Sequence, residues 1–148
     1  SSAASDVYKR QDSIVMVEIN FEAPKVQEYC DLRLNAGMSP KSIEAAEKGL
    51  PNACFNVTIY DDNKLIGMGR VIGDGGTAFQ IVDIAVNKEY QGLGHGRTIM
   101  EEIMKYIDRV AEKGTYISLM ADYPADKLYE KFGFISTEPY SKGMYIKY

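Results

Sequence analysis

A glycine-rich hexapeptide at residues 91–96, with the sequence QGLGHG, is the part of this chain whose residue types best suit the binding of an anion. It follows a β-branched run at residues 81–86 and precedes a long amphipathic stretch, so the pattern predicts a strand, a loop and a helix in that order. The first amides of a helix lack an intrahelical acceptor, and glycine lets an anion approach the main chain closely. This segment therefore predicts a phosphate-binding loop.

Two standard phosphate motifs do not fit the loop. The dinucleotide fingerprint requires glycine at position 97, which is Arg97, and the nucleoside triphosphate loop requires Gly-Lys-Ser/Thr, which is absent. A dinucleotide or nucleotide ligand is therefore disfavoured. One alternative stays open, namely a glycine-rich turn that only allows a helix to start close to a strand.

The spacing of Gln91, Gly94 and Gly96 fits the pattern Q/R-x-x-G-x-G/A, and a second motif follows at residues 125–134. That segment, ADKLYEKFGF, fits A-x-x-x-Y-x-K-x-G-F and contains Tyr129. With both motifs in order, residues 54–148 resemble the GNAT superfamily of N-acetyltransferases. The alternative for Tyr129 is core packing, because it shares an apolar helix face with Ala125, Leu128 and Phe132.

The resemblance implies an α/β (α+β) fold, with a mixed, largely antiparallel sheet flanked by helices and two parallel central strands, 79–86 and 116–120, that splay apart. It implies acetyl-CoA as co-substrate and Tyr129 as the acid that protonates the departing thiolate. The expected cofactor contacts are Ile84, Ala85, Val86, Gln91, Gly92, Leu93, Gly94, His95, Gly96, Arg97 and Asp122. At Asp122 the family often has Asn, so this contact departs from the pattern.

Asp83 is the candidate for the base that removes a proton from the attacking amine. It interrupts an apolar strand, and strict alternation would place it on one face with Ile81 and Ala85. A carboxylate there is costly unless it is paired or faces a wet cleft, so a structural, hydrogen-bonded Asp83 is an equal alternative. A bulge in the strand would change the direction in which Asp83 points.

The expected chemistry is direct attack of a small-molecule primary amine on the thioester. The single histidine, His95, belongs to the loop and is not expected to activate a serine or cysteine elsewhere, so no covalent intermediate is predicted. A catalytically inactive CoA-sensing or partner-binding module on the same fold is the alternative. The resemblance leaves the oligomeric state open, with a homodimer as one possibility.

Composition narrows the class of protein. A chain of 148 residues with 45% hydrophobic content predicts one domain. The formal net charge of −4 disfavours nucleic acid and leans toward a cationic acceptor. Cys30 and Cys54 in apolar contexts suggest reduced thiols in a cytoplasmic protein, and neither a metal site nor a membrane-spanning segment is expected.

Residues 1–13 are predicted to be a non-native, disordered segment, because Asp6 to Gln11 reads like a translated sequencing-adapter end. The acetyltransferase domain is then residues 14–148. Within it, strands are expected at 14–20, 54–60, 64–72, 79–86, 116–120, 134–138 and 144–148. The turn residues at 61–63 predict a hairpin between the second and third of these strands, and the strand at 116–120 is expected to be buried. Helices are expected from Pro24, from Ser39 as N-cap, after the glycine loop, and around Tyr129. The apolar stripe of the first helix is expected to consist of Val26, Tyr29, Cys30 and Leu34.

Overall fold

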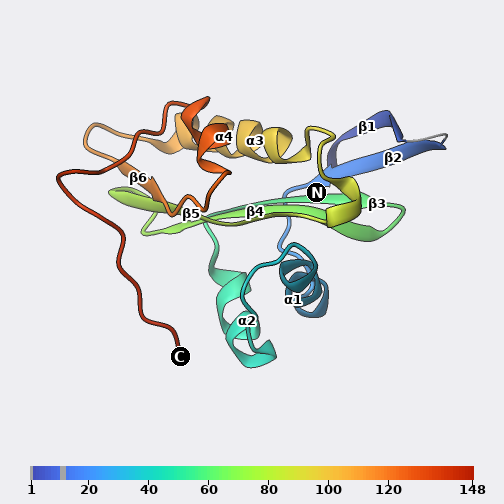
Figure 1. Ribbon diagram of the computed structural model, residues 1–148, viewed down its shortest axis with the longest axis horizontal. Helices are drawn as coiled ribbons and strands as arrows, with labels where there is room; N and C mark the ends of the chain where they lie inside the picture. Colours follow the sequence, from blue (N-terminus) through green and yellow to red (C-terminus); the bar gives the residue numbers. More distant parts are fainter. Residues whose placement is uncertain (1, 11–12) are drawn as a thin grey trace.

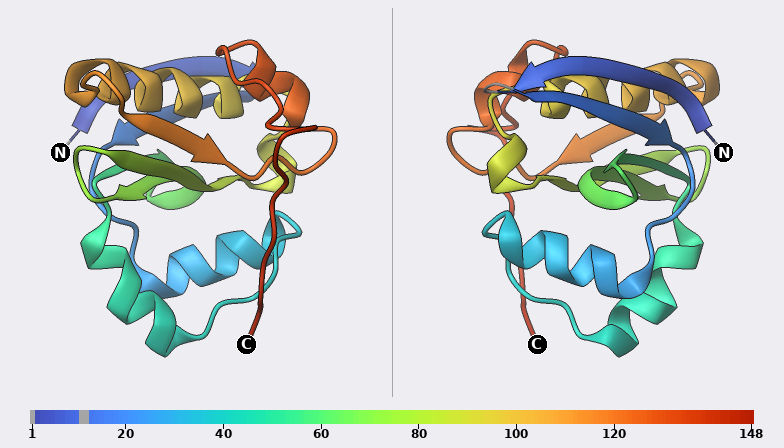
Figure 2. Two further views of the ribbon diagram at one scale, coloured as in Figure 1. Left: turned by 90° about the vertical axis from the view of Figure 1, so that its left-hand side faces the viewer. Right: turned by 90° about the vertical axis from the view of Figure 1, so that its right-hand side faces the viewer.

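The computed structural model describes residues 2–10 and 13–148, with side chains described from Met16 onward. One sheet separates two layers of helices: α3 and α4 cover one face, and α1 and α2 cover the other (Figures 1 and 2). The strands are β1 Ser2–Arg10, β2 Ser13–Asn20, β3 Phe55–Asp61, β4 Lys64–Gly73, β5 Ala78–Val86 and β6 Tyr116–Leu119. The helices are α1 Val26–Asn35, α2 Ile43–Gly49, α3 His95–Val110 and α4 Asp126–Glu130, with 3-10 turns η1 Leu50–Asn52 and η2 Lys88–Tyr90.

The six strands lie in sequence order, and every neighbouring pair is antiparallel except β5 and β6, which are parallel. Asp62 and Asn63 have positive φ angles and form the turn between β3 and β4, because aspartate and asparagine tolerate the left-handed region that tight hairpins need. The GNAT-type α/β fold class and the hairpin at residues 61–63 are confirmed.

A β-bulge interrupts the pairing of β4 with β5. Met68 pairs with Ala85 and Arg70 pairs with Val82, so two residues of β5 lie opposite Gly69 alone. Asp83 has a φ of 59° at this point. A Cβ atom at Gly69 would lie 2.6 Å from Ile84 Cδ1 and 2.6 Å from Ile99 Cγ2, so glycine is required here for β4 to fit beneath α3.

The parallel pair of β5 and β6 is short. It extends from Ala78 opposite Tyr116 to Ile81 opposite Leu119, after which β6 ends. Among the residues that the structure describes, no strand therefore lies beside residues 82–86 of β5 on the edge that faces β6. This opening is the splay that the resemblance to the GNAT family implied.

The apolar core is divided between the two faces of the sheet. Ile99, Met100, Ile103 and Ile107 of α3 are buried against one face, as the helical spacing predicted. On the other face, residues of α1 and α2 pack with Met68 and Ala85. Cys30 belongs to this second layer, whereas Cys54 packs against the first, so the two thiols are separated by the sheet and stay free.

Three local expectations were wrong in detail. Leu34 was assigned to the buried stripe of α1 but is 56% exposed, because Leu32 and Arg33 turn inward instead. The N-cap of α2 is Ser42, whose hydroxyl accepts from the amide of Ala45 at 3.0 Å, and not Ser39. The expected disorder of residues 1–13 is replaced over residues 2–10 by β1, since backbone pairing with β2 does not require apolar side chains. Residues 1, 11 and 12 lie outside the described residues.

The C-terminal expectations were also wrong. The segment at 116–120 forms β6, but Tyr116 and Met120 are 59% and 58% exposed and so are not buried. The two closing strands at 134–138 and 144–148 do not form, because the chain after α4 passes the end of β6, where Gly143 lies beside Met120, and does not run along the free edge of β6. None of the helices in the described ranges has the length and apolar character that crossing a bilayer requires.

Candidate functional site

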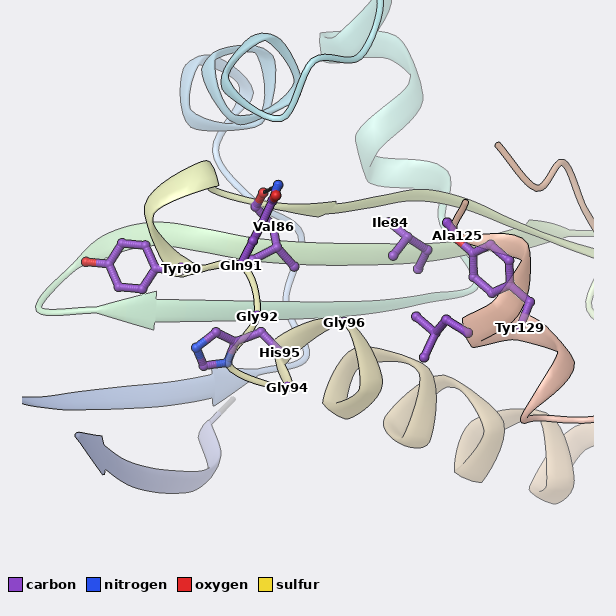
Figure 3. Close-up of a pocket in the computed structure, with 11 residues that line it drawn as sticks. Ile84, Val86, Tyr90, Gln91, Gly92, Gly94, His95, Gly96, Ala125 and Tyr129 are labelled. Carbon is purple, nitrogen blue, oxygen red and sulfur yellow. Dashed lines mark hydrogen bonds between the residues drawn. The ribbon is translucent and has the colours of Figure 1, made fainter. Parts of the chain in front are cut away.

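A cavity of about 280 Å³ lies between the end of β5, the glycine loop and α4 (Figure 3). Its volume is near the lower end of the range usual for small-molecule sites. The residues that line it are Ile84, Val86, Tyr90, Gln91, Gly92, Gly94, His95, Gly96, Ala125, Leu128 and Tyr129. The structure therefore brings both sequence motifs, which are about thirty residues apart, to one site.

The loop has the geometry of an anion-binding helix start. Gly92 and Gly94 have φ angles of 79° and 89°, which only glycine adopts readily. The first helical bond of α3 runs from the amide of Thr98 to the carbonyl of Gly94 at 3.0 Å, so no carbonyl of α3 accepts from the amides of Gly96 and Arg97. The positive end of the helix dipole lies at the same place.

The open edge of β5 leads into this loop. Asn87 donates its amide to Ile66 O on β4 at 2.8 Å, so the main-chain groups of Val86, one residue earlier, point away from β4 and toward the splay. Gln91 Nε2 donates to the carbonyl of Val86 at 2.9 Å and thereby ties the loop to the strand. By the same alternation the main-chain groups of Ala85 point toward β4, where Ala85 pairs with Met68.

Tyr129 is the ionisable side chain of α4 that reaches the cavity. It is buried, it packs against the core on the α3 face, and Figure 3 shows its ring near Ile84. Burial raises the pKa of the Tyr129 phenol above its usual value, and the nearby carboxylate of Asp122 raises it further. The phenol is therefore protonated at neutral pH, which is the form that a proton donor needs.

Some of the predicted cofactor contacts do not line the cavity. Ala85 is buried on the opposite face with α1 and α2. Leu93 is half-buried, and Arg97 and Asp122 are exposed, none of them within the cavity wall. The Asp122 carboxylate raises the pKa of Tyr129, and the Asp122 carbonyl accepts from the amide of Ala125, which lines the cavity.

Asp83 occupies a buried charge cluster on the α1/α2 face. Its Oδ1 accepts from Arg33 Nη1 at 2.5 Å, and its Oδ2 accepts from Arg70 Nη1 at 2.8 Å and from the Tyr29 hydroxyl at 3.0 Å. The bulge puts Asp83 on the same face as Ala85, whereas Ile81 packs on the α3 face. The expectation that Asp83 and Ile81 share a face was therefore wrong, because the extra residue breaks strict alternation.

The three partners of Asp83 were not identified from the sequence. Tyr29 was assigned only to the apolar stripe of α1, and nothing in the local pattern marks Arg33 or Arg70 as buried. Burial raises the pKa of Tyr29 to about 12, with the Asp83 carboxylate as the next contribution. Tyr90, which lines the cavity, was also missed, although its place at the start of the glycine loop could have suggested it.

A second, smaller cavity of about 220 Å³ lies on the α1/α2 face. It is lined by Tyr29, Lys41, Ala45, Ala46, Gly49, Leu50 and Arg70. Two of these residues also contact Asp83, so this cavity borders the charge cluster. Among the described residues, no group of three or more His, Cys, Asp or Glu side chains is arranged to hold a metal ion.

Comparisons with known proteins agree with this geometry. The family model described as "Acetyltransferase (GNAT) domain" matches residues 52–136. A crystal structure of a Staphylococcus aureus protein of unknown function, described as a probable acetyltransferase, is 68% identical and matches 90% of this chain and 100% of its own, with a TM-score of 0.88. A GNAT family protein of Streptococcus pneumoniae shares the fold at 23% identity and a TM-score of 0.70, over 90% of this chain and 98% of its own.

A further relative is described as an uncharacterized N-acetyltransferase of Porphyra purpurea. It is 27% identical over 130 residues, which are 85% of this chain and 72% of the relative. The family model covers more than half of the chain, and the two motifs that line the cavity lie within its match. This chain belongs to the GNAT acetyltransferase family.

Proposed function

We propose that this protein is an N-acetyltransferase that transfers an acetyl group from acetyl-CoA to a primary amine of a small molecule. The observation that carries the proposal is the single cavity that joins the glycine loop, the open edge of β5 and the Tyr129 phenol. An anion-binding loop, a free strand edge and a protonated acid are the three elements that a CoA thioester requires.

The residues present fit the co-substrate in an extended pose. The amides at the start of α3 would hold the pyrophosphate, and glycine at 92 and 94 leaves open space in which no Cβ atom would intrude. The pantetheine arm would then add along the splayed edge of β5, pairing with the amide of Val86. In this proposal Ala85 makes no main-chain contact with the co-substrate, because its own main-chain groups point toward β4. Its role is to hold β5 in place beside β4.

The reaction proceeds by direct attack of the neutral amine on the thioester carbonyl. The new C–N bond forms, the C–S bond breaks, and Tyr129 gives its proton to the departing sulfur. The proton that the amine loses goes to solvent, from which the phenolate regains one, so the products are an amide and free CoA. Holding both reactants in line can lower the barrier by about 7 to 11 kcal/mol, so no covalent enzyme intermediate is needed.

The role of Asp83 as the general base stays a prediction. Both carboxylate oxygens are engaged by Arg33, Arg70 and Tyr29, so Asp83 must lose one of these contacts before it can accept an amine proton. Its position supports a second role, in which the cluster holds the bulge that turns Val86 toward the co-substrate. A pH–rate profile of Asp83→Asn separates the two, because loss of a base shifts the profile to alkaline pH and loss of support does not.

The acceptor is proposed to carry an acidic group beside its amine. The overall charge of −4 favours cationic ligands in general, but the cavity on the α1/α2 face is lined by Lys41 and Arg70. This cavity borders Asp83 in β5, because its lining residue Arg70 contacts the Asp83 carboxylate. An acceptor that entered it would approach β5 from the face of the sheet opposite the glycine loop. A panel that pairs each plain amine with its carboxylate or phosphate derivative tests this preference.

The decisive experiment measures thiol release from acetyl-CoA with that panel, for the natural chain and for Tyr129→Phe. We expect turnover with at least one amine, and a decrease of at least about tenfold in Tyr129→Phe while calorimetry still detects CoA binding. Tyr140→Phe, a change at an exposed tyrosine, is the matched control and should be silent. CoA binding without any turnover would identify an inactive CoA-binding module, and no CoA binding would reject the proposed ligand.

A further inference from the structure

The charges around Asp83 do not balance. Its carboxylate accepts from two guanidinium groups, from Arg33 Nη1 at 2.5 Å and from Arg70 Nη1 at 2.8 Å. The third partner, the Tyr29 hydroxyl, is a neutral donor. Guanidinium groups stay protonated in proteins, so within the described contacts this cluster has one more positive charge than negative charges. Its charged side chains are nine-tenths or more buried, where an uncompensated charge is costly.

The two arginines differ in how many of their donors are used. Arg33 donates from Nη1 to Asp83, and from Nε and Nη2 to the carbonyl and hydroxyl of Ser39 at 3.0 and 3.1 Å. Arg70 donates from Nη1 to Asp83 and from Nη2 to the carbonyl of Gly49 at 3.2 Å. Arg70 Nε is buried and has no acceptor in the described part of the chain. An additional anion would therefore bind at Arg70 and not at Arg33.

The unused donor of Arg70 belongs to the side of the guanidinium group that lies at the smaller cavity, of about 220 Å³. Nε and Nη2 share one edge of the group, and Gly49, which accepts from Nη2, lines this cavity together with Arg70. Lys41 is the other charged residue of the wall, and no acidic residue lines it among the residues described. Two neighbouring N–H groups of an arginine match the geometry of a carboxylate or a phosphate.

The rest of the cavity limits what else a ligand can contain. Ala45 and Ala46 of α2 and Leu50 of η1 form an apolar part of the wall. The volume is below the range of about 300 to 1,000 Å³ that is usual for sites enclosing a whole ligand. The cavity therefore suits the acidic end of a ligand and a short aliphatic stem, while the other end of the ligand lies outside it.

We propose that Arg70 is the specificity-determining residue of the acceptor site, and that the Nε and Nη2 edge of its guanidinium group binds the carboxylate or phosphate of an aliphatic amine. The acidic group accepts from Nη2 and, after a small rotation of the guanidinium group, from Nε. Lys41, which is exposed, adds a second positive charge. Asp83 is then a positioning residue, because it holds Arg70 by Nη1 and leaves the other edge for the acceptor.

This inference rests on the proposed acetyltransferase function and identifies the residue that selects the acceptor. Asp83 lies in the bulge of β5, next to Ile84, which lines the cavity of the glycine loop. An acidic group bound to Arg70 is thus anchored one guanidinium group away from Asp83 in β5. The length of the aliphatic stem decides whether the amine reaches the thioester, so the acceptor is selected by chain length as well as by charge.

The first test compares amines that carry a terminal carboxylate or phosphate with plain alkylamines of the same chain length, by thiol release from acetyl-CoA. At the best length we expect kcat/KM to be at least about tenfold higher for the acid-bearing amine, mainly through a lower KM. Arg70→Lys keeps the charge but not the two-donor edge, so it should reduce this ratio by at least about tenfold. Loss of folded protein lowers both rates equally and leaves the ratio unchanged.

Two further variants separate binding from positioning. Lys41→Gln should reduce the same ratio by a smaller factor, because Lys41 contributes charge at an exposed position. Lys48→Gln, at an exposed lysine of α2 outside the cavity wall, is the matched control and should leave the ratio unchanged. Asp83→Asn should also reduce the ratio, since Arg70 loses the anion that holds it. An equal decrease for both amines in Asp83→Asn would show that Asp83 does not position Arg70.

Calorimetry with inorganic phosphate or glutarate in the absence of CoA tests the anion site separately from turnover. We expect binding to the natural chain and weaker binding to Arg70→Lys. Equal kcat/KM for plain and acid-bearing amines would overturn the inference and leave the proposed function intact, even if phosphate binds, because the cavity would then take a free anion and not the acceptor. Absence of turnover with every amine would count against the proposed function itself. Anion binding that is unchanged in Arg70→Lys would overturn the inference whatever the turnover.

Discussion

The two faces of the sheet are organised by different kinds of interaction. On the α3/α4 face, the cavity is lined by residues of β5 and the glycine loop between 84 and 96, with Tyr129 as the ionisable side chain that α4 contributes. On the α1/α2 face, Asp83 is held by Tyr29, Arg33 and Arg70, which are 54, 50 and 13 residues away in the sequence. The first site includes the main-chain amides of one loop, whereas the second consists of charged and polar side chains that are dispersed in the sequence.

This difference predicts how each face responds to mutation. A site made of main-chain groups is damaged when backbone conformation changes, while the removal of most side chains matters little. A buried charge cluster is damaged when one member is removed, because the remaining charges lose their partners in a medium of low polarity. The bulge at Asp83 and Ile84 joins the two faces, so disturbance of the cluster should also reach the cavity.

Removal of the Asp83 carboxylate should have the largest effect on the stability of the fold. Asp83→Ala leaves Arg33 and Arg70 buried without their anion, so we expect a loss of about 3–5 kcal/mol in the free energy of unfolding. Chemical denaturation measures this loss. Asp31→Ala, on the same α1 but exposed, is the matched control and should change stability by less than about 0.5 kcal/mol. Equal effects of the two changes would show that the cluster does not support the fold.

Removal of the Tyr29 hydroxyl should have the next largest effect, and this effect should depend on pH. Tyr29→Phe removes a hydrogen bond to a carboxylate, which is worth about 1.5–3 kcal/mol. The folded-state pKa of Tyr29 is about 12, above the value near 10 of an unfolded chain, so its stabilisation is complete below pH 10 and is lost as the pH rises through 12.

Denaturation of both proteins across this pH range measures the effect. The difference in stability between the natural chain and Tyr29→Phe should shrink between pH 10 and pH 12. An absorbance titration provides a second readout, since the variant should lack one tyrosine among those that ionise last. A constant difference in stability across the range would mean that Tyr29 does not bind Asp83 as its neutral phenol.

Overpacking at the bulge tests whether the two faces are coupled. Gly69→Ala places a methyl group against Ile84 and Ile99, so we expect a destabilisation of about 1–3 kcal/mol and weaker CoA binding, because Ile84 must move. Gly67→Ala in the same strand is the matched control, since its nearest contact would be an ordinary 3.4 Å. If Gly69→Ala loses stability but keeps full CoA affinity, the cavity is independent of the bulge.

Backbone strain in the glycine loop should have the smallest effect on stability and a selective effect on binding. Gly94→Ala forces alanine to adopt a φ of 89°, at a cost of about 1–2 kcal/mol. Gly75→Ala, in the turn between β4 and β5, meets the same strain at a φ of 86° and also has open space around it. Both variants should lose similar stability, but only Gly94→Ala should weaken CoA binding measured by calorimetry.

The sequence-based predictions were correct for features formed by neighbouring residues and wrong for several that depend on how distant parts of the chain meet. The loop, the amphipathic face of α3 and the hairpin at residues 61–63 were predicted correctly because each depends on residues that are neighbours in the chain. The expectation that Asp83 shares a face with Ile81 was wrong, although the one that it shares a face with Ala85 was right, because one extra residue in a strand reverses the alternation on either side of it. The closing strands were wrong because an alternating pattern gives a strand only where the chain runs along an edge, and residues 139–148 pass the end of β6 without pairing with it.

What the sequence determined by itself is the local chemistry: a glycine loop between a strand and a helix, and a tyrosine on a later helix. The spacing of the residues was sufficient to predict these two features, because helix starts and turns depend on a few consecutive residues. Only the tertiary structure decided that the loop and Tyr129 share one cavity, and that Asp83 lies between two arginines. Those arrangements depend on how α1, β4 and β5 pack, and packing is set by contacts between residues that no local pattern brings together.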